Sequence, residues 1–568
     1  MQPAPDIPHA QRPKGLAPKC LRALPWAVLA LGAYGLLYAI PTIGTPGSDE
    51  CMHSISALRF YELLRLGDWG GFWREFHKPE FYTPLGRLGM GLGYLSGLGY
   101  TAPRFATALA WLFATSLCIP LTRRVTGSGP VGSVASALCV AMMLGSWLAV
   151  SYCRTAYLEA WSAAILLITV HTYLRARDRD SGRWALACGL LLGAAVLVKS
   201  NYGLFAVGAV GLSGLSDLVR RPAGLRSGAL ARNVFIGLAS CLGWWFFLPL
   251  PMGLEYGALH RDTMLEYLTK HQILTSHGPR FLAVAWGLMA CHSLAVFAIQ
   301  VVGLLWALPR WSNPATRMCA ILGIVAPLAF ALAPYRIDRF LLPTLFGACV
   351  LGAAATTLLI ARLRTPLLRV CASGVLAAVV LGLPNLGKVR VLQWTFPGDY
   401  TPDQLAAMGD ASAQWSRPFA ERPAPAGGPA GTEALLRSAL QHMDPKQAFL
   451  WIGGTGTEWP PTLVDWTLYT MQRDPSILFR ARDQRAWFLS EPTGPSGAPW
   501  NEQEFRDFTR AYPQVFVLDP PDPKGRPREF EQRYAQWMAN HPGFQAVAQV
   551  AGRLGDREFH VRVYRPAP

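Results

Sequence analysis

The sequence predicts a polytopic α-helical membrane protein of about eleven spans, followed by an external soluble α/β domain. Of the 568 residues, 51% are hydrophobic and only 15% are charged. The mean hydropathy of +0.23 is too high for an ordinary soluble enzyme. Beyond about residue 390 the apolar density falls. We therefore expect a membrane part over residues 23–390, a linker over 391–430 and an external domain over 431–568.

The first apolar run, LPWAVLALGAYGLLYAI, follows a basic N-terminal segment, residues 1–22. A signal peptide has a similar pattern, but here a clear small-x-small cleavage site is lacking and many further spans follow. We therefore expect an uncleaved first helix. The runs FATALAWLFATSLCIPL, VGSVASALCVAMMLGSWLAV and GACVLGAAATTLLIA also approach the roughly 20 apolar residues that a helix needs to cross a bilayer.

The distribution of charge explains the formal net charge of +17. In a soluble protein such a charge would suggest a nucleic-acid partner, but here arginine and lysine gather in alternate loops, as the positive-inside rule requires. The basic segments are Arg12–Arg22, Arg123–Arg124, Arg175–Arg183, Arg220–Arg232, Arg310–Arg317 and Arg362–Arg369. This alternation predicts a cytoplasmic N-terminus and an external C-terminal domain.

The same alternation makes residues 44–102 one long external loop. Counting YTPLGRLGMGLGYLSGLG as a span would place Arg123 and Arg124 outside and reverse every later loop. We therefore expect residues 84–99 to form a re-entrant or surface helix. HSISALRFYELLRL, residues 53–66, is expected to form an amphipathic helix that lies on the membrane interface.

Alternating apolar residues predict the strands of the C-terminal α/β domain. QAFLWIGG, QVFVLD and REFHVRVYRP are expected as strands, and NEQEFRDFTRAY and REFEQRYAQWMANH as helices. Gly555 and Asp556 predict a hairpin turn. The chain's 11 cysteines all lie at or before Cys371, mostly in apolar runs, where we expect small buried fillers. No CxxC or histidine-rich pattern indicates a metal site.

Charged residues on the external side carry the most information about function. This set comprises Asp49, Glu50, Arg154, Glu159, Lys199, Arg336, Asp338 and Arg339. Each residue alone has an ordinary explanation, such as a side chain that snorkels from a helix end or a solvated acid at a helix start. Their common side of the membrane favours one shared site.

Carboxylates and cations at the outer face of a membrane suit the transfer of a sugar from a polyprenyl phosphate. A carboxylate can take the proton from an acceptor hydroxyl as that hydroxyl attacks the anomeric carbon. Arginine, or a divalent metal ion held by carboxylates, can neutralise the departing phosphate. The arrangement predicts a reaction of this kind.

Further residues are candidates to line a cavity at such a site. His53 follows Asp49 by four residues and would share a helix face with it if a helix has begun there. A single histidine beside acids is, however, more often a surface residue. Lys78, Glu80 and Tyr82 precede the expected surface helix, where a solvated loop is an equally good interpretation. Arg154 and Asp338 of the charged set above are also candidates to line the cavity.

These motifs together resemble the GT-C superfamily of integral membrane glycosyltransferases. The resemblance covers roughly residues 20–390, through the order PGSDE, KPEFYTPLGRL, SYCRTAYLE, GLLLGAAVLVKSNYGLF and PYRIDRFLLPTLFGACVLGAA. Within the superfamily, the chain most resembles the branch of protein O-mannosyltransferases and lipid A aminoarabinose transferases. The resemblance implies a polyprenyl-phosphate sugar donor, an inverting transfer, and a protein, lipid or glycan acceptor. It also implies a plasma (inner) membrane location and no nucleic-acid partner.

Carried over residue by residue, the resemblance implies roles for the carboxylates. The acidic motif of the family's first loop falls on Asp49 and Glu50 and makes Asp49 the catalytic base. The second external carboxylate falls on Glu159, where the family more commonly has aspartate. Glu159 would orient the acceptor or, together with Asp49, hold a divalent metal ion.

The resemblance also implies which cations bind the donor. The family's Arg-aromatic-Leu-Leu-Pro pattern falls on Arg339–Pro343, so that Arg339, with Arg336 nearby, would bind the donor phosphate. Lys199 matches a lysine that often ends the corresponding helix. The family's usual Pro-Pro-Leu is here Thr83–Leu85, which changes the expected packing of the first loop.

Two other functional classes stay open. A transporter or flippase of lipid-linked sugars could also use arginine and carboxylates in the membrane, although such proteins usually show internal repeats and broken helices. A non-catalytic scaffold that presents the external domain is a further alternative. Such a scaffold would not need Asp49, Glu159 and Arg339 on one side of the membrane.

Overall fold

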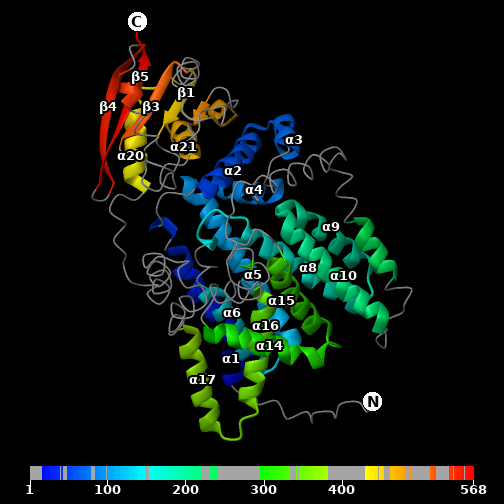
Figure 1. Cartoon of the computed structure of the whole chain (residues 1–568). Coiled ribbons are helices and arrows are strands. Elements are labelled where there is room, and N and C mark those ends of the chain that lie inside the picture. The colour runs from blue at the N-terminus through cyan, green and yellow to red at the C-terminus, as the bar shows by residue number, and fades with distance from the viewer. Residues whose placement is uncertain are drawn as a thin grey trace. The chain divides into compact units, whose positions relative to one another are not determined.

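The chain folds into two compact units. The helical unit comprises Met1–Leu36, Leu109–Ser151 and Glu159–Pro418, and the mixed unit comprises Leu37–Ala108, Tyr152–Leu158 and Phe419–Pro568. Figure 1 labels most of their helices and strands. The computed structural model describes residues 16–38, 40–42, 48–78, 83–97, 99–146, 152–220, 231–240, 294–332, 341–342, 345–381, 429–444, 447–452, 461–479, 485–487, 512–519, 536–540, 543–554 and 557–567.

Apolar helices build the helical unit. The helices that lie wholly or mostly in this unit are α1 (Leu16–Tyr38), α5 (Ala102–Thr126), α6 (Pro130–Gly145), α8 (Glu159–Arg179), α9 (Gly182–Val198), α10 (Ser200–Arg220), residues 231–240, α14 (Leu294–Ala307), α15 (Pro314–Leu332), α16 (Leu345–Ala361) and α17 (Pro366–Leu381). Pro130, Pro314 and Pro366 each open a helix, where the N–H that proline lacks would have no partner in the helix. Gly127, with φ 90°, ends α5.

Several of these helices have the length and composition of membrane spans. Cys20–Tyr38, Ala102–Thr126 and Tyr202–Arg220 are long and apolar enough to cross a bilayer, and shorter apolar helices of 10–17 residues accompany them. They support the predicted membrane location. The total of about eleven spans stays a prediction, because segments such as 241–293 lie outside the described residues.

Basic residues gather at the last turns of particular helices. Arg123 and Arg124 end α5, Arg177 and Arg179 end α8, and Arg220 ends α10. The basic loops predicted from the sequence therefore adjoin helix ends, where cations also interact favourably with the helix dipole. The side of the membrane on which each end lies stays a prediction.

A buried carboxylate near the end of α10 joins three helices of this unit. Asp217 is fully buried and accepts hydrogen bonds from Nε of Arg177 on α8 and from Nη2 of Arg317 on α15, each at 2.7 Å. The hydroxyl of Tyr173 also donates to Asp217, at 3.4 Å. The two guanidinium groups offset the cost of burying the carboxylate charge.

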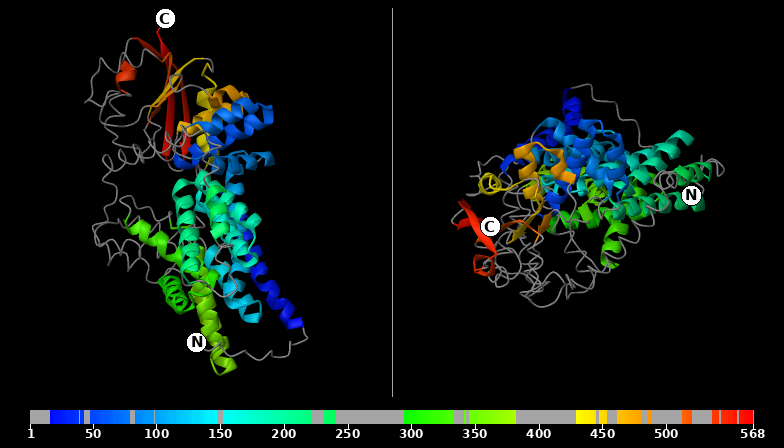
Figure 2. Two further views of the ribbon diagram at one scale, coloured as in Figure 1. Left: turned by 90° about the vertical axis from the view of Figure 1, so that its right-hand side faces the viewer. Right: turned by 90° about the horizontal axis from the view of Figure 1, so that it is seen from above.

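Close packing of helices depends on small residues. Helices α8, α9 and α10 lie side by side (Figures 1 and 2), as do α14 and α16. A Cβ atom on Gly303 of α14 would meet backbone atoms of Leu351 and Gly352 on α16. A Cβ atom on Gly347 would come within 2.5 Å of the carbonyl oxygen of Cys319 on α15. These contacts leave no room for a side chain at either glycine.

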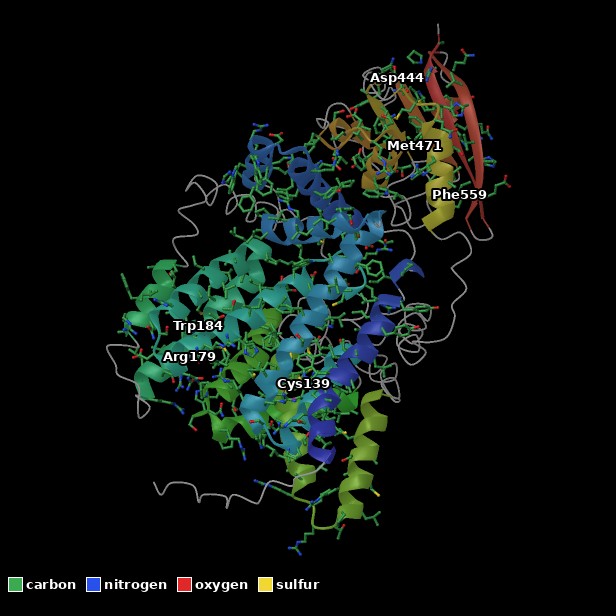
Figure 3. The ribbon with its side chains drawn as sticks, turned by 180° about the vertical axis from the view of Figure 1, so that it is seen from behind. Cys139, Arg179, Trp184, Asp444, Met471 and Phe559 are labelled. Atoms are coloured by element: carbon green, nitrogen blue, oxygen red, sulfur yellow. The ribbon has the colours of Figure 1, made fainter. Side chains whose placement is uncertain are left out.

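Cysteines occupy the interior of the same helices. Cys118 of α5, Cys139 of α6, Cys319 of α15 and Cys349 of α16 are all buried free thiols, and Figure 3 labels Cys139. The prediction of small buried fillers is confirmed at these positions. Cys371, which lies on α17, is exposed.

In the mixed unit, the long loop predicted from the sequence forms short helices. They are α2 (Ser48–Leu66), α3 (Trp69–His77) and α4 (Pro84–Gly91), the last continued by the 3-10 helix η2 (Leu92–Ser96). Asp68 caps α3 by accepting a hydrogen bond from the N–H of Gly71 at 2.7 Å. Because α4 has 8 residues, it is only about 12 Å long and cannot span a bilayer. This agrees with the surface or re-entrant helix predicted for residues 84–99.

The prediction for α2 was wrong in two respects. The helix begins at Ser48 rather than near His53. Its expected place on the membrane interface stays a prediction, but the helix was also expected to carry its polar residues on an exposed face. Instead it buries polar residues such as Glu50, Arg59 and Glu62 as well as apolar ones such as Phe60. The polar side chains are buried because they bond to other segments of the mixed unit, and a sequence pattern does not show such partners.

A mixed sheet of order β2-β1-β3-β5-β4 forms the C-terminal part of this unit. The strands are β1 (Phe449–Ile452), β2 (Arg485–Trp487), β3 (Gln514–Asp519), β4 (Phe544–Leu554) and β5 (Arg557–Pro566). β1 pairs parallel with β2 and β3, whereas β5 pairs antiparallel with β3 and β4. The predicted strands are confirmed as β1, β3 and β5. Leu554 pairs with Arg557, as the predicted turn through Gly555 and Asp556 requires.

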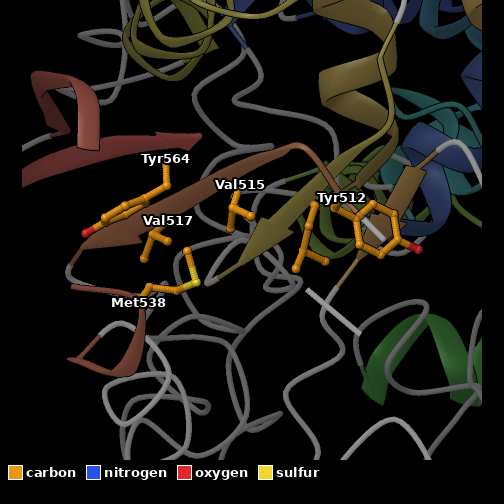
Figure 4. Close-up of a cluster of buried hydrophobic side chains, with 6 residues drawn as sticks. Tyr512, Val515, Val517, Met538 and Tyr564 are labelled. Atoms are coloured by element: carbon orange, nitrogen blue, oxygen red, sulfur yellow. The ribbon is translucent and has the colours of Figure 1, made fainter. Parts of the chain in front are cut away.

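Helices α20 (Pro429–Leu440) and α21 (Pro461–Gln472), the 3-10 helix η6 (Pro475–Phe479) and residues 536–540 accompany the sheet. The last of these confirms the end of the helix predicted over residues 528–541, whereas the helix predicted over 501–512 lies outside the described residues up to Ala511. Figure 4 shows an apolar core cluster against the sheet. It comprises Leu450, Tyr512, Val515, Val517, Met538 and Tyr564.

The close approach of α14 to α16 gives a testable prediction. We expect Gly303→Ala to lower the stability of the protein by about 1–3 kcal/mol, because the added methyl group overpacks against the α16 backbone. The matched control is Gly208→Ala on α10, where an added Cβ meets nothing within 4 Å among the described residues. Alanine should be neutral or slightly stabilising there. Thermal unfolding in detergent measures both, and equal melting temperatures would contradict the packing described.

Candidate active site

The acidic pair at the start of α2 is the first part of the site. Asp49 and Glu50 lie in the first turn of α2, which begins at Ser48. A helix N-terminus carries a partial positive charge, which favours carboxylates at these positions. The side chain of Asp49 lies outside the described part of the structure, whereas that of Glu50 is described and is buried.

Glu50 is held by partners from two other segments. Its Oε1 accepts a hydrogen bond from Nε of Arg104 at 2.6 Å, and its Oε2 accepts one from Nη2 at 3.0 Å. The backbone N–H of Ala156 donates to Oε1 at 2.9 Å. The side chains of Glu50 and Arg104 are 4% and 0% exposed. This bidentate pair fixes the first turn of α2 against the start of α5 and against residues 152–158.

We did not predict the role of Arg104 from the sequence. It lies at the start of an apolar run, at the end opposite to Arg123 and Arg124. A cation at that end departs from the alternation of basic loops. This departure is the feature of the sequence that could have indicated a special role for Arg104. An arginine placed against the charge bias of a membrane protein often has a buried acidic partner.

His53 lies next to residues 152–158, the segment that contains Ala156. Because α2 has already begun at Ser48, Asp49 and His53 are four residues apart on one helix and share a face, as predicted. The His53 ring is buried and packs edge-on to Tyr157, with ring centroids 5.9 Å apart. Tyr157 in turn packs edge-on to Tyr152 at 5.1 Å. Arg154, a predicted cavity residue, lies in this segment and is half-buried.

In the helical unit, the structure brings together Glu159 and Lys199. Glu159 is the first residue of α8, and Lys199 follows the last residue of α9. Lys199 Nζ lies 2.6 Å from Glu159 Oε1, and the two side chains are 13% and 0% exposed. The ammonium group also lies 5.4 Å from the centre of the Tyr202 ring. The sequence predicted both residues for the site but not that they form a pair.

Several predicted site residues lie outside the described residues. They are Arg336, Asp338, Arg339, Glu80 and Tyr82. Lys78 is described and ends α3, where its backbone N–H donates to the carbonyl oxygen of Glu75. Among the described residues, no group of three or more His, Cys, Asp or Glu side chains is arranged to hold a metal ion.

The Glu50–Arg104 pair gives a second testable prediction. Arg104→Met should lower the free energy of unfolding by about 3–5 kcal/mol, because it leaves a buried carboxylate without its counter-ion. The control is Arg232→Met, which breaks the exposed pair between Arg232 and Asp180 and should cost about 0–1 kcal/mol. Chemical unfolding in detergent compares the two, and equal losses would contradict a structural role for the Glu50–Arg104 pair.

Part of the chain is similar to a known enzyme family. The family model "Dolichyl-phosphate-mannose-protein mannosyltransferase" matches residues 91–265. This range contains Arg104, Glu159 and Lys199 but not Asp49. No curated protein matches the chain.

Solved structures match over most of the chain. ArnT from Cupriavidus metallidurans, in a structure bound to undecaprenyl phosphate, is 17% identical with a TM-score of 0.52, covering 94% of this chain and 97% of that chain. The apo state of ArnT gives 18% identity and a TM-score of 0.51, with 95% and 97% covered. The apo oligosaccharyltransferase of Archaeoglobus fulgidus is 12% identical with a TM-score of 0.52, covering 87% of this chain and 69% of that chain. The chain therefore has the fold of the GT-C superfamily of membrane glycosyltransferases, as the resemblance of its motifs predicted.

Proposed function

We propose that the protein is a membrane glycosyltransferase that moves a sugar from a polyprenyl phosphate to an acceptor on the external face, with inversion at the anomeric carbon. The observation that carries this proposal is the fixed start of α2, where Glu50 is bound by Arg104 and Ala156 directly beside Asp49. A base must be held in position to act on an acceptor hydroxyl. The GT-C fold and the family match over residues 91–265 support the same reaction class.

Asp49 is the proposed general base. As the acceptor oxygen forms a bond to the anomeric carbon, its proton passes to the carboxylate of Asp49. The bond from that carbon to the phosphate oxygen breaks, and polyprenyl phosphate leaves with the electron pair. Attack on the face opposite the phosphate inverts the configuration. Glu50 then acts through its position, because its two oxygens already accept hydrogen bonds from Arg104 and Ala156.

Cations are needed where the phosphate departs. Arg339 and Arg336 are proposed to bind it, since a guanidinium group donates two parallel hydrogen bonds to a phosphate. Lys199 is proposed to act beside them. Because the Lys199 ammonium pairs with Glu159, this acid and its cation form a neutral pair that an incoming phosphate would have to rearrange.

A divalent metal held by Asp49 and Glu159 has less support. Glu159 Oε1 already accepts from the ammonium of Lys199 at 2.6 Å, and a bound metal would have to displace that cation. We therefore derive no step through a metal ion. Glu159 is instead proposed to orient Lys199 and, through it, the donor phosphate.

The names of the related proteins suggest the substrates. The ArnT structure with undecaprenyl phosphate supports a polyprenyl-phosphate donor, and a protein, lipid or glycan acceptor fits the range of related enzymes. We propose a plasma (inner) membrane location with the N-terminus in the cytoplasm. The acceptor would then meet the enzyme on the periplasmic or extracellular side.

Substitution of the base gives a third testable prediction. Asp49→Asn should lower the rate of sugar transfer by about 10²–10⁴-fold while donor binding is retained, because the amide cannot accept the proton. The matched control is Asp68→Asn in the same unit, where asparagine still caps α3 and transfer should be unchanged. Transfer is measured with purified protein in liposomes and a panel of radiolabelled polyprenyl-phosphate sugars.

The same assay tests the alternative function. Consumption of a donor by the wild type, lost in Asp49→Asn, supports the transferase. If no donor is consumed while lipid-linked sugar changes leaflet, the protein is a flippase and the proposal fails. A wild-type rate in Asp49→Asn would remove the role of Asp49.

A further inference from the structure

The second half of α2 contacts the C-terminal part of the mixed unit through buried polar groups. Arg59 donates from Nε to the backbone carbonyl oxygen of Leu478 in η6, at 2.7 Å. A terminal nitrogen of Arg59 lies 3.6 Å from Oε1 of Glu75 on α3. The Arg59 side chain is only 11% exposed, so both contacts are shielded from water. A buried guanidinium group strongly favours the one position in which its partners are in reach.

One turn further along α2, Glu62 makes a second contact of this kind. Its Oε1 accepts a hydrogen bond from the hydroxyl of Tyr469 on α21. Its Oε2 accepts two hydrogen bonds from Arg65, at 2.9 and 2.7 Å. The Glu62 side chain is 1% exposed. Removal of the tyrosine hydroxyl would therefore leave a buried carboxylate oxygen short of a donor.

Aromatic stacking joins the same two parts. Tyr94 of η2 stacks on Trp466 of α21, with ring centroids 5.7 Å apart and an angle of 27° between the planes. The Tyr94 hydroxyl donates to the backbone carbonyl oxygen of Ser54 on α2, at 3.0 Å. Tyr94 thus links α21 to the half of α2 that carries the acidic pair. We call the set of Arg59, Glu62, Tyr94, Trp466 and Tyr469 the α2 clamp.

We propose that the C-terminal part of the chain is a positioning element for the reaction centre, which acts on Asp49 through the α2 clamp. This inference rests on the proposed function. A helix transmits a rotation or shift along its length, and Asp49 lies about 20 Å from Glu62 along α2. The clamp holds the far end of the helix, and the Glu50–Arg104 pair holds the near end. Both are needed to place Asp49 to within the tolerance that a general base requires.

An acceptor-binding role for the C-terminal part is the main alternative. A binding module would contact the acceptor and be joined to the catalytic part by a surface with few buried charges. Here, however, Arg59 and Glu62 are buried and satisfied by groups of η6 and α21. Such polar contacts favour one arrangement over others more than they favour association itself. They indicate that the C-terminal part fixes the position of α2.

The pKa of Tyr469 gives a fourth testable prediction. Burial and the hydrogen bond to Glu62 raise the pKa of Tyr469 well above its ordinary value, while Arg65 and Arg473 oppose this rise. A raised pKa in the folded state means that the contribution of Tyr469 to stability is present below about pH 10 and is lost as the pH rises further. We expect the melting temperature to fall more steeply above pH 10 in the wild type than in Tyr469→Phe. Parallel pH profiles would contradict the buried contact.

The clamp itself is tested by kinetics of Tyr469→Phe and Glu62→Leu, singly and together. We expect each to lower kcat for transfer about tenfold with the acceptor KM unchanged. The double variant should be no slower than the slower of the two single variants, because both substitutions remove the same contact. The control is Tyr564→Phe, which removes a hydroxyl from the core cluster of the same unit and should leave kcat unchanged. A raised acceptor KM with unchanged kcat, or additive losses, would overturn the proposal.

Hydrogen exchange separates failure of the clamp from failure of the proposed function. In Tyr469→Phe, the amides of α2 near Asp49 should exchange about tenfold faster, whereas those of α9 should not change. If the wild type transfers no sugar, the proposed function fails, and exchange alone decides whether the C-terminal part holds α2. Unchanged exchange over residues 50–60 would overturn the clamp whether or not sugar is transferred.

Discussion

The mixed unit depends on one constraint, which is that α2 carries charged groups into a buried position. Glu50, Arg59 and Glu62 are all nearly inaccessible to solvent, although they lie on a helix of 19 residues. A buried charge is tolerated only when its hydrogen bonds and its countercharge are supplied locally. Each of these groups therefore requires a partner from elsewhere in the chain. The fold of the unit is largely the arrangement that provides those partners.

This constraint explains why segments far apart in the sequence meet at α2. Glu50 requires Arg104 and the N–H of Ala156, and Glu62 requires Tyr469, which lies 407 residues further along the chain. The loss of any one partner would leave a charged or polar group buried and unsatisfied. A mutation at the C-terminal contact and a mutation near the acidic pair should therefore affect the same helix. The C-terminal sheet also has an apolar core cluster of its own, which contains none of these α2 residues.

The sequence predicted those parts of the fold that depend on local pattern. Strands β1, β3 and β5 and the turn between β4 and β5 follow from alternation and from a glycine-containing pair of residues. Basic helix ends follow from the positive-inside rule. The α2 prediction failed because a polar residue that faces a buried partner has the same sequence pattern as one that faces water. Arg104 and Asp217 were missed for the same reason, since their roles exist only through partners on other helices.

The two adjacent acids at the start of α2 have a physical explanation in helix geometry. Neighbouring residues on a helix are about 100° apart around its axis, so Asp49 and Glu50 cannot face the same surroundings. One acid can then make the hydrogen bonds that hold the helix, while the other can act as the general base. Glu50 is paired with Arg104 in a dry site, and this pair holds the backbone on which Asp49 lies. A single acid could not meet both demands, because the two oxygens of Glu50 already accept hydrogen bonds from Arg104 and from the N–H of Ala156, and these bonds hold α2 in place.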